Sequence, residues 1–138
     1  MATTGRVYEF DVAVDRNGTA TSGLGGPAIV KDEEWWAEHF VLAGLVRCTL
    51  ASLGYSARRA QVDVTAQGRA HGTVEKREED GRYAFVDVEA SFEVELAPAL
   101  DAEALATMLE KTERGCFVGN SLTARPRYRW QVNGEDVR

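Results

Sequence analysis

One segment dominates the sequence, DEEWWAEHFVLAGLVRCTLASLGY at residues 32–55. Acidic residues open it, it contains no proline, and Gly54 stands near its end, so the pattern predicts one long helix from Asp32 to Gly54. Between Phe40 and Leu53 such a helix is apolar on nearly all sides. A helix of this kind is enclosed by other structure, because it has no side that favours water. The sequence therefore predicts a central helix with the rest of the fold built around it.

The segments before this helix predict extended structure. Residues 7–15, VYEFDVAVD, alternate apolar and polar side chains with the period of a half-buried strand. The turn residues RNG at 16–18 and the return TATSG at 19–23 predict a hairpin. The glycine-rich stretch 23–32 predicts a loop with a short extended piece at 28–30.

The segments after the helix predict a sheet and a second helix. Residues 60–78 and 81–97 alternate over long stretches and are joined by the turn EEDG, which is typical of two antiparallel strands with one wet face. Residues 101–115 start with a capping Asp101 and end at Gly115, which indicates a helix. A last strand is expected at 125–132. This order of elements predicts an α+β fold in which an antiparallel sheet wraps around the long helix.

Composition limits the class of protein. With 138 residues and 44% hydrophobic content, we expect a single domain over 1–138. The net charge of −6 is spread through the chain, so no basic surface for nucleic acid is expected. The N-terminus lacks the pattern of a signal peptide and no run reaches 18 apolar residues, so we expect a cytoplasmic protein without a membrane segment. The two cysteines, Cys48 and Cys116, form neither a paired zinc motif nor a disulfide scaffold, and His39 and His71 do not make a metal site.

Four residues stand out together: Arg16, Glu38, Cys48 and Cys116. The stretch EHFVLAGLVRC places Glu38 ten residues before Cys48, CFVGNSL begins with Cys116 after a predicted helix, and DRNG offers Arg16 in an early turn. On these three motifs the sequence resembles the OsmC/Ohr family (osmotically inducible protein C and organic hydroperoxide resistance protein). The family's proline after the second cysteine is Phe117 here, and its serine two positions further on is Gly119.

The resemblance implies a function and a role for each residue. Family members are cytoplasmic thiol peroxidases of the oxidative stress response, with a peroxiredoxin-like chemistry that reduces organic hydroperoxides. Cys48 would be the peroxidatic thiol, Cys116 the resolving thiol, and Arg16, held by Glu38, the cation that activates Cys48. The electron donor would be a dithiol, of the dihydrolipoyl type or on a lipoylated protein, with no bound cofactor or metal.

The spacing of Glu38 and Cys48 adds a geometric condition. Ten residues of continuous helix rise roughly 15 Å, so Glu38 does not reach Cys48 on its own helix. Two such helices packed antiparallel across a two-fold axis would bring Glu38 of one subunit to Cys48 of the other. The resemblance implies the same arrangement, an intertwined homodimer with its sites at the subunit interface.

Other interpretations stay open at this level. A buried cysteine is more often packing than nucleophile, and the cation could be Arg6 or Arg47 instead of Arg16. Phe117 and Gly119 motivate a second hypothesis, a non-catalytic OsmC-like protein that binds a small molecule or a partner. A third is a hot-dog thioesterase that uses Glu38, since that fold also wraps a sheet around a helix. Trp35 and Trp36 could line a pocket for an apolar peroxide or serve in packing.

Overall fold

The computed structural model describes residues 5–137, and the chain divides into two compact units, 1–37 and 38–138. The N-terminal unit holds a hairpin of β1 (Val12–Val14) and β2 (Ala20–Ser22). The second unit holds the remaining strands and most of the long helix.

The N-terminal hairpin confirms the predicted turn. The side chain of Asp15 accepts hydrogen bonds from the backbone N–H groups of Asn17 (2.8 Å) and Thr19 (3.0 Å), which fixes the turn that carries Arg16. The predicted extended piece at 28–30 is also present, since Ile29 forms a bridge with Ala20. The first strand is shorter than the predicted 7–15, because its ladder extends only as far as the return strand runs beside it.

The long helix α1 (Ala37–Arg59) is continuous but displaced from the predicted range. Glycine inside a helix costs about 1 kcal/mol relative to alanine. The helix nevertheless continues past Gly54, because the following turn buries Ala57 completely. The helix ends where Gln61 adopts a left-handed conformation, with φ 59°. The N–H of Val62 then donates to the carbonyl of Ala57 (3.0 Å), and the N–H of Gln61 donates to the carbonyl of Arg58 (3.1 Å). This cap usually contains glycine, so glutamine gave no signal in the sequence.

Four strands form the sheet, in the order β3–β4–β5–β6: β3 (Asp63–Lys76), β4 (Tyr83–Ala97), β5 (Arg127–Val132) and β6 (Glu135–Val137). The predicted antiparallel pairing of β3 with β4 is confirmed. The prediction of a wholly antiparallel sheet is wrong, because β4 and β5 run parallel. The chain between them returns through two helices, as a parallel connection requires. The last hairpin, which the sequence analysis missed, turns at Asn133 and Gly134, both with positive φ.

The connection from β4 to β5 contains α2 (Ala102–Arg114) and α3 (Phe117–Ser121). The predicted second helix is confirmed, and its cap is Asp101, whose carboxylate accepts the N–H of Ala104 at 2.8 Å. The short helix α3 was not predicted. It begins directly after Cys116, which serves as its N-cap residue.

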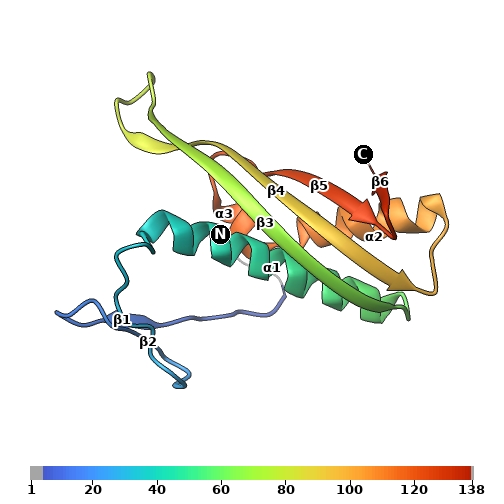
Figure 1. The fold of residues 1–138 in the computed structure, drawn as a ribbon, viewed down its shortest axis with the longest axis horizontal. Coiled ribbons are helices and arrows are strands. Elements are labelled where there is room, and N and C mark those ends of the chain that lie inside the picture. The colour runs from blue at the N-terminus through green and yellow to red at the C-terminus, as the bar shows by residue number, and fades with distance from the viewer. Residues whose placement is uncertain (1–4, 138) are drawn as a thin grey trace. The chain divides into compact units, whose positions relative to one another are not determined.

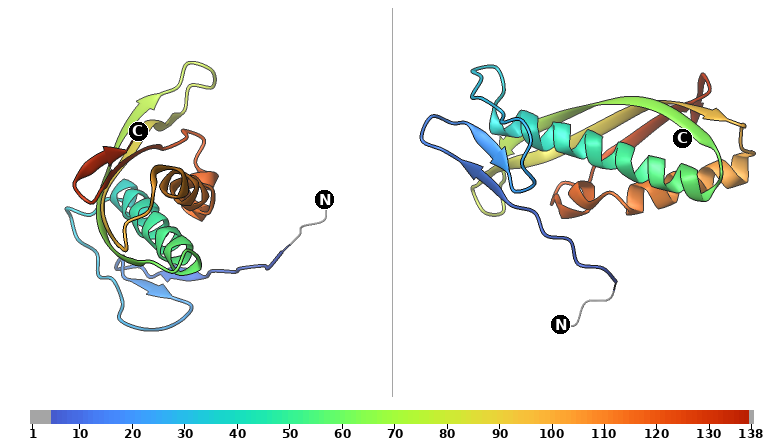
Figure 2. Two further views of the ribbon diagram at one scale, coloured as in Figure 1. Left: turned by 90° about the vertical axis from the view of Figure 1, so that its right-hand side faces the viewer. Right: turned by 90° about the horizontal axis from the view of Figure 1, so that it is seen from below.

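The hydrophobic core lies on one face of the sheet, where α1 and α2 pack (Figures 1 and 2). Strand β4 supplies the centre of this core, because every second residue from 88 to 96 is buried. The core residues of the other elements are Leu45, Leu53, Ala57, Met108, Leu109, Trp130 and Val132.

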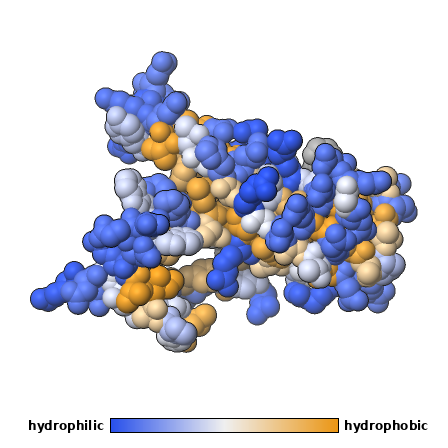
Figure 3. Space-filling view, in the orientation of Figure 1, coloured by the Kyte–Doolittle hydropathy of each residue, from blue (hydrophilic) through white to orange (hydrophobic). Residues whose placement is uncertain are grey.

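Helix α1 is only partly covered by the other elements of the second unit. Its buried residues form a single row, Leu45, Thr49, Leu53 and Ala57. Phe40 and Tyr55 stay 43% and 56% exposed, so the predicted enclosure of the helix is not achieved within the second unit. Figure 3 shows apolar residues reaching the surface between hydrophilic ones.

Among the described residues, α1 alone has the length and apolar composition of a membrane-crossing helix, which the central helix of a soluble fold also has. Because its buried row packs into the core beside the sheet, we assign α1 as a core helix and not as a membrane span.

Candidate functional site

The two cysteines meet in the second unit. Cys48 is half-buried on α1, and Cys116 is fully buried at the start of α3. Both are free thiols, and they lie close enough together that Cys116 acts on the pKa of Cys48. Residues 68 positions apart in the sequence thus form one dithiol site.

The end of α2 sets the position of Cys116. The hydroxyl of Ser52 on α1 donates to the carbonyl of Thr112 on α2 at 2.8 Å, which ties the two helices together just before the cysteine. Gly115 allows this close approach, since a Cβ at that position would lie 2.6 Å from the Ser52 oxygen. The Cys116 sulfur then accepts the N–H of Gly119 at 3.4 Å and caps α3.

Two hydroxyl groups surround the Cys116 sulfur. Thr49 Oγ1 lies 3.2 Å from it, and the Thr49 hydroxyl also donates to the carbonyl of Leu45 at 2.8 Å. The hydroxyl of Tyr128, on β5, borders the same space as the Cys116 sulfur, since both atoms would contact a Cβ added at Gly119. Cys116 and Thr49 both act on the pKa of this tyrosine. Neither Thr49 nor Tyr128 was singled out by the sequence. The only signal for Thr49 was a polar residue in an apolar helix next to a cysteine, and β5 meets the helices only through the tertiary fold.

The surroundings of Cys48 act on its pKa in both directions. Burial raises the pKa of this thiol, and the neighbouring Cys116 raises it further. The backbone N–H groups of Val118 and Phe117, at the start of α3, lie near the sulfur and lower the pKa. The net effect is a pKa above the ordinary cysteine value. Within one chain this shift favours the thiol over the thiolate, and a nearby cation would act in the opposite direction.

The other two predicted site residues lie elsewhere in the chain. Glu38 is in the first turn of α1, and because this helix is unbroken, Glu38 is roughly 15 Å from Cys48 along the axis. Arg16 lies in the hairpin turn of the N-terminal unit, whereas both thiols belong to the second unit. The structure thus brings together Cys48 and Cys116 but not Glu38 of the same chain. Within residues 5–137, no three His, Cys, Asp or Glu side chains form a group that could hold a metal ion.

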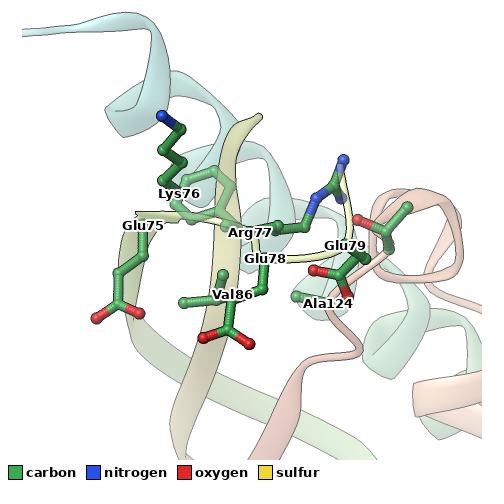
Figure 4. Close-up of a pocket in the computed structure, with 9 residues that line it drawn as sticks. Glu75, Lys76, Arg77, Glu78, Glu79, Val86 and Ala124 are labelled. Carbon is green, nitrogen blue, oxygen red and sulfur yellow. The ribbon is translucent and has the colours of Figure 1, made fainter. Parts of the chain in front are cut away.

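A surface hollow of about 850 Å³ lies at the turn end of the β3–β4 hairpin (Figure 4). Charged side chains of the hairpin dominate it, and neither cysteine lines it. One of these groups, Arg77, forms an ion pair with Asp80 at 2.6 Å across the hairpin turn. The hollow is separate from the dithiol site, and we assign it no role in thiol chemistry.

The fold and the site together define an α+β protein with a dithiol centre between a long core helix and the cap of a short one. The family model described as OsmC-like protein matches residues 31–131, which is most of the chain. The chain belongs to the OsmC family.

Solved structures share the fold at low sequence identity. An OsmC-like protein of unknown function from Vibrio cholerae matches with a TM-score of 0.75 and 15% identity, over 91% of this chain and 100% of that one. An organic hydroperoxide resistance protein from Elizabethkingia anophelis matches with a TM-score of 0.68 and 18% identity, over 94% and 98%. An OsmC-like protein from Mycoplasma pneumoniae has a TM-score of 0.68 and 14% identity, over 94% and 98%. No curated protein matches the chain.

Proposed function

We propose that this protein is a thiol-dependent peroxidase that reduces organic hydroperoxides, with Cys48 as the peroxidatic and Cys116 as the resolving cysteine. The observation that carries the proposal is the proximity of the two thiols, one half-buried and one fully buried. Cys48 is the more accessible of the two thiols, so a substrate reaches its sulfur first. The resolving thiol, Cys116, is buried next to it. Fold similarity to proteins named organic hydroperoxide resistance proteins supports the same reaction class.

The reaction needs no bound cofactor or metal. The Cys48 thiolate attacks the hydroperoxide, the O–O bond breaks, Cys48 becomes a sulfenic acid, and the alkoxide leaves as an alcohol after taking up a proton. The Cys116 thiol then condenses with the sulfenic acid, which gives a disulfide and water. A dithiol donor, of the dihydrolipoyl type or carried on a lipoylated protein, reduces this disulfide and is itself oxidised to a disulfide.

The raised pKa of Cys48 makes an activating cation necessary, and we assign that role to Arg16. A guanidinium beside the sulfur favours the thiolate, and Glu38 would hold the guanidinium in place. Since Glu38 is too far from Cys48 on the same helix, we assign it to the site of a partner subunit, in a homodimer with two equivalent centres.

Two features of α1 support the homodimer. Its apolar surface is only partly covered, as the exposure of Phe40 and Tyr55 shows. An antiparallel pair that joins Glu38 to the partner's Cys48 crosses midway between these positions, next to Gly44. A Cβ added at Gly44 would meet nothing within 4 Å in this chain, so the backbone there is open to close approach by another helix.

The proposal is tested by peroxide turnover with a dithiol donor. We expect the parent protein to reduce an organic hydroperoxide and Cys48→Ser to lose activity completely. Cys116→Ser should still consume one equivalent of peroxide per site and then stop or slow strongly, because its sulfenic acid lacks an internal resolving thiol. Equal turnover by the parent and Cys48→Ser, or none by either, would contradict the assignment.

A second candidate is an OsmC-like protein that binds a small molecule or partner without catalysis. Two observations favour it: the pKa of Cys48 is raised within one chain, and Phe117, in the position of the family's proline, is 51% exposed beside the thiols. This candidate expects both thiols to remain reduced under mild organic hydroperoxide, which mass spectrometry of the intact protein distinguishes from the oxidised pair.

A further inference from the structure

The Cys116 sulfur is surrounded by a buried polar cluster that includes Thr49, Tyr128 and the backbone of Gly119. The Cys116 side chain has no exposed surface, and neither has that of Thr49. A polar cluster inside a core is costly unless its hydrogen bonds are satisfied, and within the described residues every buried side-chain nitrogen and oxygen has a partner. The cluster therefore fixes the orientation of each member.

The hydrogen-bond donors and acceptors in this cluster can be assigned. Thr49 has one hydroxyl proton, and it goes to the carbonyl of Leu45 at 2.8 Å. The contact between Thr49 Oγ1 and Cys116 Sγ at 3.2 Å therefore has the S–H as donor and the threonine oxygen as acceptor. Among the hydroxyl groups of the cluster, Tyr128 is then the one with a proton to donate toward the cysteine sulfur, which borders the same space beside Gly119.

Gly119 leaves the space that the Tyr128 hydroxyl fills. A Cβ at position 119 would collide with that hydroxyl, and would also lie 3.4 Å from the Cys116 sulfur. A side chain at 119 and the hydroxyl of Tyr128 thus exclude each other at one place beside the thiol. This chain has glycine at 119 where the family has serine, and the hydroxyl of Tyr128 on β5 fills the space that the side chain would take.

We propose that Tyr128 is a positioning residue for the resolving thiol, whose hydroxyl stands in the space of an absent side chain at 119 and holds Cys116 toward Cys48. This inference rests on the proposed function for its role in turnover. When Cys116 attacks, its proton leaves and negative charge develops on sulfur, and Tyr128 can donate to that charge. Burial, the first cause, and then the nearby Cys116 raise the pKa of Tyr128, so the hydroxyl stays a donor.

The surrounding titratable groups do not replace Tyr128. Cys48 faces Cys116 from α1, and Glu113 on α2 acts on Tyr128 and accepts the indole N–H of Trp130 at 2.8 Å. Neither Cys48 nor Glu113 offers a hydroxyl group beside the Cys116 sulfur. Thr49 is committed to the carbonyl of Leu45.

The test uses an aromatic disulfide, dithionitrobenzoate, and needs no peroxide. The Cys48 thiolate breaks the reagent's S–S bond, forms a mixed disulfide and releases one coloured thiolate. Cys116 then loses its proton, attacks the sulfur of Cys48 in the mixed disulfide and releases a second coloured thiolate, leaving the Cys48–Cys116 disulfide. The two phases of absorbance therefore report the two cysteines separately, and Cys116→Ser shows only the first.

We expect Tyr128→Phe to slow the second phase about tenfold, as the loss of one hydrogen bond to the reacting group would, and to leave the first phase within about twofold. Gly119→Ser should slow the second phase as well, because its Cβ displaces the tyrosine hydroxyl. The double variant Gly119→Ser/Tyr128→Phe should recover to within about threefold of the parent, since the serine hydroxyl takes the vacated space. Tyr83→Phe, at a tyrosine that is 75% exposed, is the matched control and should change neither phase.

A parental second phase in Tyr128→Phe overturns the inference. A double variant that is slower than either single variant also overturns it. An equal slowing of both phases in Tyr128→Phe would show a purely structural role and overturn it as well. Circular dichroism and melting temperature confirm that each variant is folded. If the second phase responds as expected while organic hydroperoxide leaves Cys48 unoxidised, the positioning role of Tyr128 stands and the proposed peroxidase function fails.

Discussion

The helices α1 and α2 pack on the same face of the sheet but differ in how completely one chain accommodates them. Helix α2 has 13 residues, a capping Asp101 and a row of core residues that ends with Thr112 against α1. Helix α1 has 23 residues and buries only one row, with apolar residues such as Phe40 and Tyr55 left exposed. A helix whose apolar surface exceeds what its own unit covers indicates a further packing partner.

This difference separates structural stability from the proposed catalysis. Helix α2 is capped and packed by residues of its own chain, so substitutions on it should change the stability of the folded single chain. Cys48 lies half-buried beside the uncovered part of α1, which in our proposal makes the contacts that bring Arg16 and Glu38 to it. Changes there should affect assembly and the thiol before they affect folding.

The largest effect is expected for Gly44→Lys. Lysine is a better helix former than glycine by about 1 kcal/mol, so the single chain should not lose helicity. A charged side chain at the helix crossing should nevertheless abolish self-association, measured by sedimentation or light scattering, and peroxide turnover with it.

Two substitutions serve as controls for this effect. Gly54→Lys lies on the same helix, roughly 15 Å from Gly44, and Ala106→Lys lies on the exposed side of α2. Both should leave the oligomeric state of the parent unchanged. If Gly44→Lys still associates, the antiparallel crossing at this position is wrong.

An intermediate effect is expected on the pKa of Cys48. In the separated Gly44→Lys chain, burial and then Cys116 hold the pKa above its ordinary value, so the folded chain favours the thiol form. The stability this gives is present below the ordinary pKa and is lost as pH rises through the raised one. In the assembled parent, Arg16 should lower the pKa by about one unit or more.

The pH dependence of the alkylation rate of Cys48 measures this difference. Arg16→Gln should move the assembled protein toward the value of the separated chain, whereas Arg58→Gln, at an exposed arginine near the end of α1, should not. An unchanged alkylation profile in Arg16→Gln would assign the activating cation to another residue.

The smallest effect is expected for the cap of α2. Asp101→Ala removes the hydrogen bond to the N–H of Ala104 and should lower the free energy of unfolding by about 1 kcal/mol, with no change in self-association. Urea denaturation measures it, and Glu103→Ala, an exposed substitution in the same turn, is the control. A change of oligomeric state in Asp101→Ala would show that α2 is not independent of assembly.

Elements with a strong local signal were predicted well from the sequence. The alternation in β3 and β4, the cap at Asp101 and the turn at Arg16 are short-range patterns, and each is confirmed. The end of α1 was misplaced, because Gln61 takes the conformation expected of glycine. The parallel pairing of β4 and β5 was missed for a related reason, since strand direction depends on how the connection packs and not on either strand.

The sequence by itself determined the central apolar helix, the two cysteines and the residue types available around them. Only the tertiary structure decided that Cys48 and Cys116 meet, that Thr49 and Tyr128 surround the second thiol, and that Glu38 is remote from the first within one chain. The physical reason is that periodicity and caps act over a few residues. The position of a sulfur inside a core depends on contacts between elements that are far apart in the sequence.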